Sequence, residues 1–284
     1  MNTHNRKPSR RFAVIGAGGK TGRRVTQRLQ SQGHSVRTLS RSTSPAFDWA
    51  QAHNWPAALQ GIDALYVTYQ PDLAVARAQE DIGQLIRCAK DSGVEHIVLL
   101  SGRGEAGAQQ AEQVLITSGL SWNLVRASWF CQNFSESFMA QGILDGELCL
   151  PADTIREPFV DTDDIADVAV AALTRPALAN RVFEVTGPEL LTFAECVAEI
   201  SRQTGRPIAY RTVAAEQWLQ VLQQQGVPDD IRDLLKELFT EVLDGRNASL
   251  STGVTEALQR PPTPFATYVR KTIDAGLWSP AVTD

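Results

Sequence analysis

Residues that build disulfide frameworks and metal sites are scarce in this sequence. Its 284 residues include four cysteines and four histidines. The cysteines form no Cys-x-x-Cys pair, and the histidines lack the spacing of a metal-binding motif. These absences exclude a disulfide scaffold and a zinc module, and we expect no metal. Unpaired thiols are typical of a reducing compartment, so we expect a cytoplasmic protein.

Long apolar runs and an excess of positive charge are also missing. No apolar segment approaches the roughly 20 residues that a membrane span needs. The net charge is −5, which argues against nucleic acid and anionic membranes as partners. Basic residues gather only near the start, where no apolar signal region precedes the first strand, so we expect a flexible arm over residues 1–10. The expected partner is a small-molecule substrate, with the chain a monomer or a homodimer.

Short apolar runs alternate with helical periodicity between residues 11 and 130. The pattern predicts strands at 12–15, 35–39, 64–68, 96–100 and 122–125, and helices near 20–33, 73–92 and 106–118. A short strand at 46–48 is a weaker prediction. Strands that alternate with helices favour parallel pairing, with helices on both faces of the sheet. The predicted fold is therefore α/β, a Rossmann-type doubly wound parallel sheet.

The pattern changes after residue 130. Asp161 is a suitable N-cap for a helix, 182–185 predicts one more strand, and Thr192 to Glu195 forms a capping box for a helix that Gly205 ends. Residues 228–245 have the periodicity of a helix. We expect 131–284 to be a mixed segment that completes the sheet and forms a smaller, mostly helical substrate-binding cap.

A glycine-rich turn joins the first strand to the first helix. The string Gly16-Ala17-Gly18-Gly19-Lys20-Thr21-Gly22 has the strand–turn–helix context of a dinucleotide-binding motif. Glycines permit a tight turn, a close approach of backbone to a diphosphate, and close packing of helix on strand. The helix N-terminus then offers N–H donors to the phosphates. The alternative is a glycine turn that binds no ligand.

The end of the second strand bears on which dinucleotide binds. An acid there usually binds the ribose 2′-hydroxyl of NAD, but this strand ends in Ser40-Arg41-Ser42. A guanidinium with two hydroxyls suits the 2′-phosphate of NADPH, and Arg37 and Arg23 are possible supports. Residues 11–130 are thus predicted to be an NADP-binding domain, unless Arg41 is a solvated loop residue. The predicted cofactor-binding residues are Gly16, Gly18, Gly19, Lys20, Thr21, Gly22, Ser40, Arg41, Ser42, Asp48, Thr68 and Ser101.

Reactive and substrate-binding groups are expected at the carboxyl ends of the strands, where ligands of open parallel sheets bind. Ser101 and Arg103 occupy positions suited to a proton donor or an oxyanion partner, and Tyr69 is a third catalytic candidate. The predicted substrate-binding residues are Tyr69, Trp129, Phe130, Asn133 and Phe134. For the aromatic ones, packing between sheet and cap is an equally good interpretation.

A proton-donating pair that short-chain dehydrogenases generally use is missing. These enzymes carry Tyr-x-x-x-Lys, but the corresponding helix, 106–118, has neither tyrosine nor lysine. We therefore do not expect the alcohol and ketone chemistry of that pair. Hydride transfer to an iminium ion needs no such acid, only positioning and electrostatic support.

Several segments together resemble the NmrA-like branch of atypical short-chain dehydrogenases. They are Gly16–Gly22, Phe47–Trp49, Gly93-Val94 leading into Val98–Ser101, and Pro158–Asp161 with Asp164–Ala166. The segments Trp129–Glu136 and Gly187–Thr192 are similar to the ergot-alkaloid reductase group, which includes agroclavine dehydrogenase and festuclavine synthase. That resemblance implies NADPH-dependent reduction of a cyclic iminium in secondary metabolism. Two alternatives stay open: a quinone or enone reductase, whose branch carries a lysine where this chain has Gln113, and a non-catalytic regulator that senses NADP.

Overall fold

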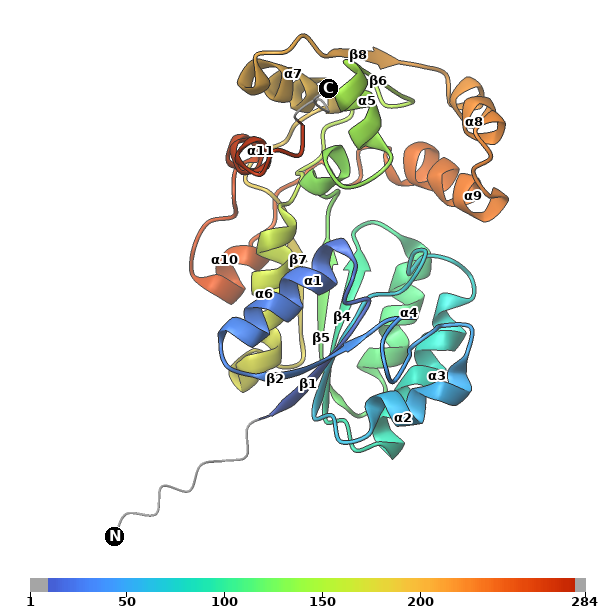
Figure 1. The fold of residues 1–284 in the computed structure, drawn as a ribbon, viewed down its shortest axis with the longest axis vertical. Coiled ribbons are helices and arrows are strands. Elements are labelled where there is room, and N and C mark those ends of the chain that lie inside the picture. The colour runs from blue at the N-terminus through green and yellow to red at the C-terminus, as the bar shows by residue number, and fades with distance from the viewer. Residues whose placement is uncertain (1–9, 279–284) are drawn as a thin grey trace, which may run out of the picture. The chain divides into compact units, whose positions relative to one another are not determined.

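The computed structural model describes residues 10–278, and nearly all of the predicted N-terminal arm lies outside this range. A six-stranded sheet has the order β2-β1-β3-β4-β5-β7 (Figure 1). Its strands are β1 (Arg11–Ile15), β2 (Ser35–Leu39), β3 (Ala64–Val67), β4 (His96–Gly102), β5 (Ser121–Ala127) and β7 (Arg181–Val185). The pairs β1–β2, β1–β3 and β3–β4 are parallel, as the sequence predicted. The strand order reverses between β1 and β3.

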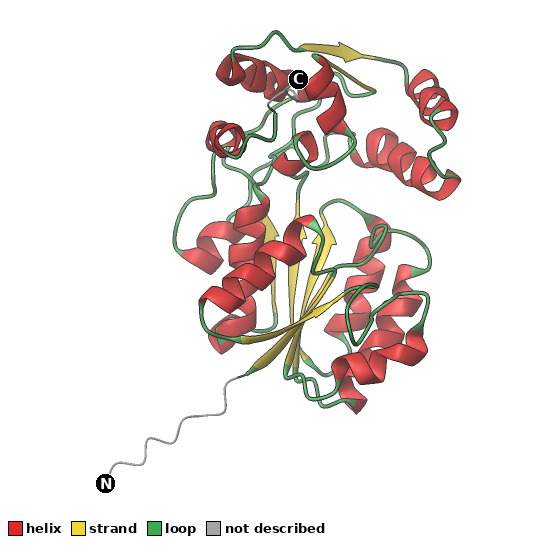
Figure 2. Cartoon of the chain, in the orientation of Figure 1, coloured by secondary structure: helices red, strands yellow, loops and turns green. Residues whose placement is uncertain are grey.

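Helices cover both faces of this sheet (Figure 2). On one face lie α1 (Lys20–Ser31) and α6 (Thr162–Thr174), where Arg28 Nε donates to Asp167 Oδ1 at 2.5 Å. On the other lie α2 (Trp55–Leu59), α3 (Ala78–Asp91) and α4 (Ala106–Ile116). Alternate strand side chains face this second layer and are fully buried there with the helices, among them Ala13, Ile15, Leu65, Val67, Ile97 and Leu99. The doubly wound prediction is confirmed.

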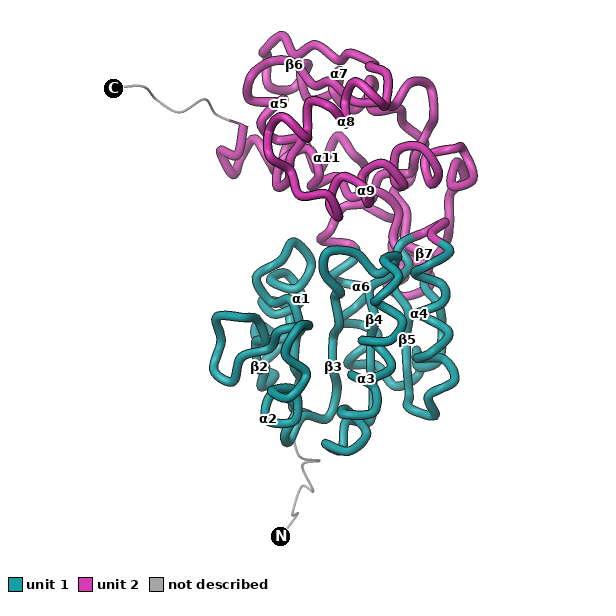
Figure 3. Tube along the Cα trace, turned by 90° about the vertical axis from the view of Figure 1, so that its right-hand side faces the viewer, with its two compact units in different colours: residues 1–102, 106–126, 165–183 teal, residues 103–105, 127–164, 184–284 magenta. Residues whose placement is uncertain are grey.

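The chain divides into two compact units (Figure 3). Unit 1 holds residues 1–102, 106–126 and 165–183, and unit 2 holds 103–105, 127–164 and 184–284. The helices of unit 2 are α5 (Met139–Asp145), α7 (Phe193–Thr204), α8 (Ala215–Gln224), α9 (Asp229–Glu237), α10 (Gly253–Leu258) and α11 (Phe265–Asp274). Strands β6 (Glu147–Leu150) and β8 (Ala209–Thr212) pair in parallel. A cluster of buried aromatic rings, including Phe134, Phe159, Phe193 and Phe265, forms its core.

Capping of two helices follows the sequence. Thr192 Oγ1 accepts a hydrogen bond from Glu195 N, while a Glu195 carboxylate oxygen accepts one from Thr192 N, so the capping box of α7 is complete. At the start of α6, Asp161 Oδ1 accepts a hydrogen bond from Asp163 N at 2.9 Å. The buried Asp164 carboxylate accepts hydrogen bonds from Thr263 N and Thr263 Oγ1, at 2.6 and 3.0 Å. These two aspartates therefore stabilise unit 2.

Some predicted elements differ in the structure. The strand expected at 46–48 is wrong: this segment is irregular, because Phe47 turns inward and stacks on Trp55 with ring centroids 5.3 Å apart. The helix expected over 228–245 is an α-helix only from Asp229 to Glu237, and a π-helix follows from Leu238 to Val242. The strands β6 and β8 were not predicted. None of the side chains of β8 is buried, so its sequence lacks the apolar alternation that predicts a strand.

Candidate cofactor and active site

The turn after β1 has room only for glycine at two positions. Gly16 has a φ of +76°, and a Cβ there would lie 2.0 Å from Thr68 Oγ1. A Cβ on Gly22 would lie 2.1 Å from the carbonyl oxygen of Gly16. The first glycine thus permits the tight turn, and the second lets α1 pack directly against it. Thr68 Oγ1 also donates to the Ile15 carbonyl at 3.1 Å, which joins the ends of β1 and β3.

The N-terminus of α1 has the properties of an anion-binding site. Its N-cap, Gly19, offers no side chain to the first-turn N–H groups, and no acid occurs in the first turn. The first N–H groups of an α-helix point away from its own carbonyl groups and can bind an anion. A Cβ on Gly18 would meet nothing within 4 Å, so the backbone is approachable. By contrast, α7 satisfies its own N-terminus with a capping box. The turn therefore fits the diphosphate of a dinucleotide.

A hydrogen-bonded loop follows β2. Ser40 N donates to Thr43 Oγ1 at 3.0 Å, and Ser40 Oγ and Ser42 Oγ lie 3.1 Å apart. This arrangement leaves the Arg41 side chain exposed, and no hydrogen bond or ion pair ties it to another residue in the range 10–278. The loop contains no acid. Its exposed guanidinium beside two hydroxyls suits a phosphate ester.

Two other residues proposed for the adenosine half have partners within the protein. The Arg37 guanidinium donates to the carbonyl oxygens of Ala58 and Gln60, at 2.8 and 2.9 Å. Asp48 Oδ1 accepts a hydrogen bond from Ala50 N at 3.0 Å. Arg37 therefore stabilises the C-terminal end of α2, and the Asp48 side chain stabilises the turn that follows it.

The hydroxyl of Tyr69 is bonded to a buried carboxylate. It donates to Asp81 Oδ2 at 2.6 Å, and Arg77 pairs with the same carboxylate at 3.0 Å. Burial and the hydrogen bond to Asp81 raise the pKa of Tyr69 well above its ordinary value. Its ring packs against Trp49, with centroids 4.6 Å apart. A phenol with a raised pKa that already donates its proton is a weak proton donor, so this geometry supports packing rather than acid catalysis.

Ser101, at the carboxyl end of β4, belongs to a buried polar network that sequence reasoning missed. Its Oγ donates to Glu112 Oε1 at 2.6 Å, and the Arg126 guanidinium donates to both oxygens of Glu112, at 3.0 and 2.5 Å. Glu112 lies on the buried face of α4, and Arg126 lies in β5. The available signal was a single acid, Glu112, among the otherwise apolar buried residues of α4.

Arg103 has a structural environment within unit 2. Its guanidinium donates to the carbonyl oxygens of Asn247 and Ser249, at 2.9 and 2.7 Å, and to Ser249 Oγ at 2.8 Å. It also pairs with Glu184 at 3.4 Å. The side chain therefore secures the 247–249 segment, and this geometry does not support the catalytic role predicted for it.

The predicted substrate-binding residues of unit 2 differ in burial. Phe134 is fully buried and packs against Phe159 and Phe265, so this geometry supports a role in the core rather than the predicted contact with substrate. It was placed by its position after the strand, which does not reveal a core contact. Trp129, Phe130 and Asn133 are partly exposed. Trp129 packs against Phe193 and Phe239, with centroids 5.3 and 5.0 Å away.

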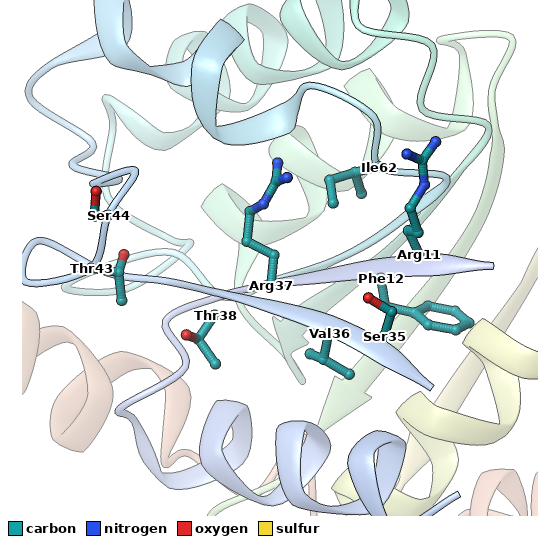
Figure 4. Close-up of a pocket in the computed structure, with 9 residues that line it drawn as sticks. All are labelled: Arg11, Phe12, Ser35, Val36, Arg37, Thr38, Thr43, Ser44 and Ile62. Carbon is teal, nitrogen blue, oxygen red and sulfur yellow. The ribbon is translucent and has the colours of Figure 1, made fainter. Parts of the chain in front are cut away.

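A hollow of about 470 Å³ lies along β1 and β2. In Figure 4, Thr43 and Ser44 lie at one end and Arg11 and Phe12 at the other. Arg37 also lines it, but no residue of the glycine turn does. The hollow follows the edge of the sheet and is distinct from the predicted cofactor site.

The described residues contain neither a membrane-spanning helix nor a metal-binding cluster. None of the helices in residues 10–278 is long and apolar enough to cross a membrane. Within the same range, no group of three or more His, Cys, Asp or Glu side chains is arranged to hold a metal ion.

The fold and the glycine turn define a Rossmann-type protein of the dinucleotide-binding class. The model of the NmrA-like family matches residues 8–268, so the chain belongs to that family. It is 31% identical to an NAD(P)H azoreductase of Xenophilus azovorans, over 90% of this chain and 96% of that protein. It is 29% identical to agroclavine dehydrogenase of Claviceps fusiformis, with coverage of 90% and 95%. The structure of an NADPH-dependent quinone oxidoreductase of Escherichia coli, in complex with NADPH, superposes with a TM-score of 0.78 at 20% identity, covering 92% of this chain and 99% of that one.

Proposed function

We propose that this protein is an NAD(P)H-dependent oxidoreductase that uses NADPH to reduce a small molecule. The observation that carries the proposal is the glycine-rich turn before α1, whose N-cap offers no side chain, together with the loop after β2, which has an exposed arginine and no acid. The turn would hold the diphosphate, and Arg41, Ser40 and Ser42 the 2′-phosphate. When bound, NADPH supplies a hydride. The similarity to the NAD(P)H azoreductase and to agroclavine dehydrogenase supports the same class of activity.

The acceptor that we propose is a cyclic imine or iminium ion. The buried face of α4 presents Ala108, Ala111, Glu112 and Leu115, with no tyrosine or lysine to donate a proton. The Tyr69 hydroxyl and the Ser101 hydroxyl already donate to carboxylates. An acceptor that already carries positive charge needs no proton from these groups. The relationship to agroclavine dehydrogenase is consistent with such a substrate.

A quinone, enone or azo acceptor is the second candidate, and the azoreductase and the quinone oxidoreductase favour it. Steady-state NADPH oxidation with an N-methylated cyclic iminium, a cyclic imine, a naphthoquinone, an enone and an azo dye would separate the candidates. We expect the highest kcat/KM for the permanently charged iminium, with little dependence on pH. Faster turnover of the quinone or the azo dye would replace the first candidate with the second. Tight NADPH binding without turnover of any acceptor would indicate a sensor.

Reversing the charge at position 41 should change the cofactor preference. The substitution Arg41→Asp removes the proposed partner of the 2′-phosphate, and a charge-assisted hydrogen bond of this kind is worth about 1.5–3 kcal/mol. We expect the Kd for NADPH to rise about 10- to 100-fold, while the Kd for NADH stays within about twofold. Arg87→Asp, the same change at an exposed position of α3, should leave both constants unchanged. An equal loss for both cofactors would show that Arg41 does not face the phosphate.

A further inference from the structure

The network around Ser101 determines the direction of its hydrogen bonds. The Ser101 side chain is buried, and its Oγ lies 2.6 Å from Glu112 Oε1. A carboxylate has no proton to give, so the serine must be the donor. Glu112 itself is only 2% exposed and accepts two hydrogen bonds from Arg126. In this hydrogen-bonded network, Glu112 is the acceptor and both Ser101 and Arg126 are donors.

Within this network, the Ser101 hydroxyl can only accept a hydrogen bond from a ligand. A serine hydroxyl has one proton and two lone pairs, and the proton is already directed at Glu112. Toward a ligand, Ser101 thus offers lone pairs and binds an N–H or O–H group. It cannot donate to a developing oxyanion without breaking a 2.6 Å hydrogen bond to a buried carboxylate. The proton-donor role predicted for Ser101 is therefore disfavoured.

The position of Ser101 narrows the choice of donor. It lies at the carboxyl end of β4, on the β3–β4–β5 side of the point where the strand order reverses. A dinucleotide lies across that point, with its two mononucleotide halves on opposite sides. The glycine turn and the Arg41 loop belong to β1 and β2, so the adenosine half belongs there. The nicotinamide half then belongs with β3 and β4, and its carboxamide carries an NH₂ donor.

We propose that Ser101 accepts a hydrogen bond from the carboxamide NH₂ of the nicotinamide ring, and that Glu112 and Arg126 are positioning residues that impose this polarity. The inference rests on the proposed NADPH-dependent function and adds how one end of the cofactor is recognised. All three residues belong to unit 1. Neither Glu112 nor Arg126 contacts the cofactor in this proposal. They act by holding the Ser101 proton away from it.

The test compares NADPH with its 3-acetylpyridine analogue, in which a methyl group replaces the carboxamide NH₂ and the carbonyl acceptor remains. Binding of each is measured by titration of the protein, with no substrate present. We expect the wild type to bind NADPH about tenfold more tightly than the analogue, since one hydrogen-bond donor is lost. Ser101→Ala should reduce that ratio to near one, and Ser101→Thr, which retains a hydroxyl, should restore it. Glu112→Gln should lower the ratio, because a glutamine amide can donate to Ser101 and release its proton.

Gln113→Ala, at an exposed position one residue further along α4, is the matched control and should keep the wild-type ratio. A wild type that binds the two cofactors equally would overturn the proposal, and so would a Ser101→Ala variant with weaker binding but an unchanged ratio. A wild-type ratio near one overturns the proposal without any variant, and Ser101→Thr shows whether the protein tolerates a replacement at position 101. The outcome is also separate from turnover. If the preference for NADPH over the analogue depended on Ser101 but no acceptor were reduced, the reductase proposal would be wrong and this inference would still hold.

Discussion

Replacing Gly22 with alanine is expected to destabilise the protein and weaken cofactor binding, although alanine is the better helix former. A Cβ at this position would lie 2.1 Å from the carbonyl oxygen of Gly16, and no rotamer change can move either atom. Forcing such an overlap typically costs about 3 kcal/mol, whereas the gain in helix propensity is about 1 kcal/mol. The steric cost dominates, so we expect a net loss of about 2 kcal/mol, or about 5 °C in melting temperature.

The matched control for this prediction is Gly18→Ala. A Cβ on Gly18 would meet no atom within 4 Å, and its φ is not positive. The melting temperature of Gly18→Ala, measured without cofactor, should therefore equal that of the wild type. In Gly22→Ala, α1 must move away from the turn, so we also expect the Kd for NADPH to rise more than tenfold. Equal melting temperatures for both variants would contradict the packing described for α1.

The stability of the wild type is expected to fall between pH 5 and pH 8, with Glu157 as a main cause. Its side chain is fully buried in unit 2, and neither carboxylate oxygen has a hydrogen-bond partner within residues 10–278. Burial raises the pKa of Glu157 from 4.5 to about 7, while Arg103 opposes this rise and Asp244 adds to it. Between pH 4.5 and about pH 7, Glu157 is therefore mostly protonated in the folded state and mostly ionised in the unfolded state.

The direction of the effect follows from proton linkage. A carboxyl group with a raised folded-state pKa contributes stability that is complete below pH 4.5 and is lost as the pH rises through 7. For this shift, the loss between pH 5 and pH 8 amounts to about 2.5 kcal/mol. Glu157→Gln cannot ionise, so urea unfolding of this variant should show a decline smaller by about that amount. The free energy of unfolding of the variant minus that of the wild type should therefore be more favourable to the variant at pH 8 than at pH 5.

A surface acid provides the comparison. Glu237 is exposed at the end of α9, and Glu237→Gln should follow the wild-type stability curve across the same pH range. If Glu157→Gln declined as steeply as the wild type, its carboxyl would not be the group that titrates. Glu157 has no role in the hydride transfer proposed above, so NADPH binding offers a check that unit 1 remains intact in the variant.

Much of the nucleotide-binding unit could be predicted from the sequence because the signals are local. The bounds of β2 match the predicted strand, and both hydrogen bonds of the predicted capping box of α7 are present. Gly16 and Gly22 have the steric roles that their spacing predicted. The order of apolar runs and helices also predicted the doubly wound sheet, because a parallel pair needs a crossover connection.

The sequence by itself determined the family, the glycine turn and the strand end without an acid, since each depends on short segments whose residues are consecutive. Only the tertiary structure decided what the separated side chains do. Arg103 bonds to residues more than 140 positions away, and Phe134 enters the core of unit 2. Ser101 of β4 donates a hydrogen bond to Glu112 of α4, and Glu112 also accepts one from Arg126 of β5. Partners of this kind are set by how elements pack, and a buried carboxylate or guanidinium determines the polarity of its neighbours only once that packing exists.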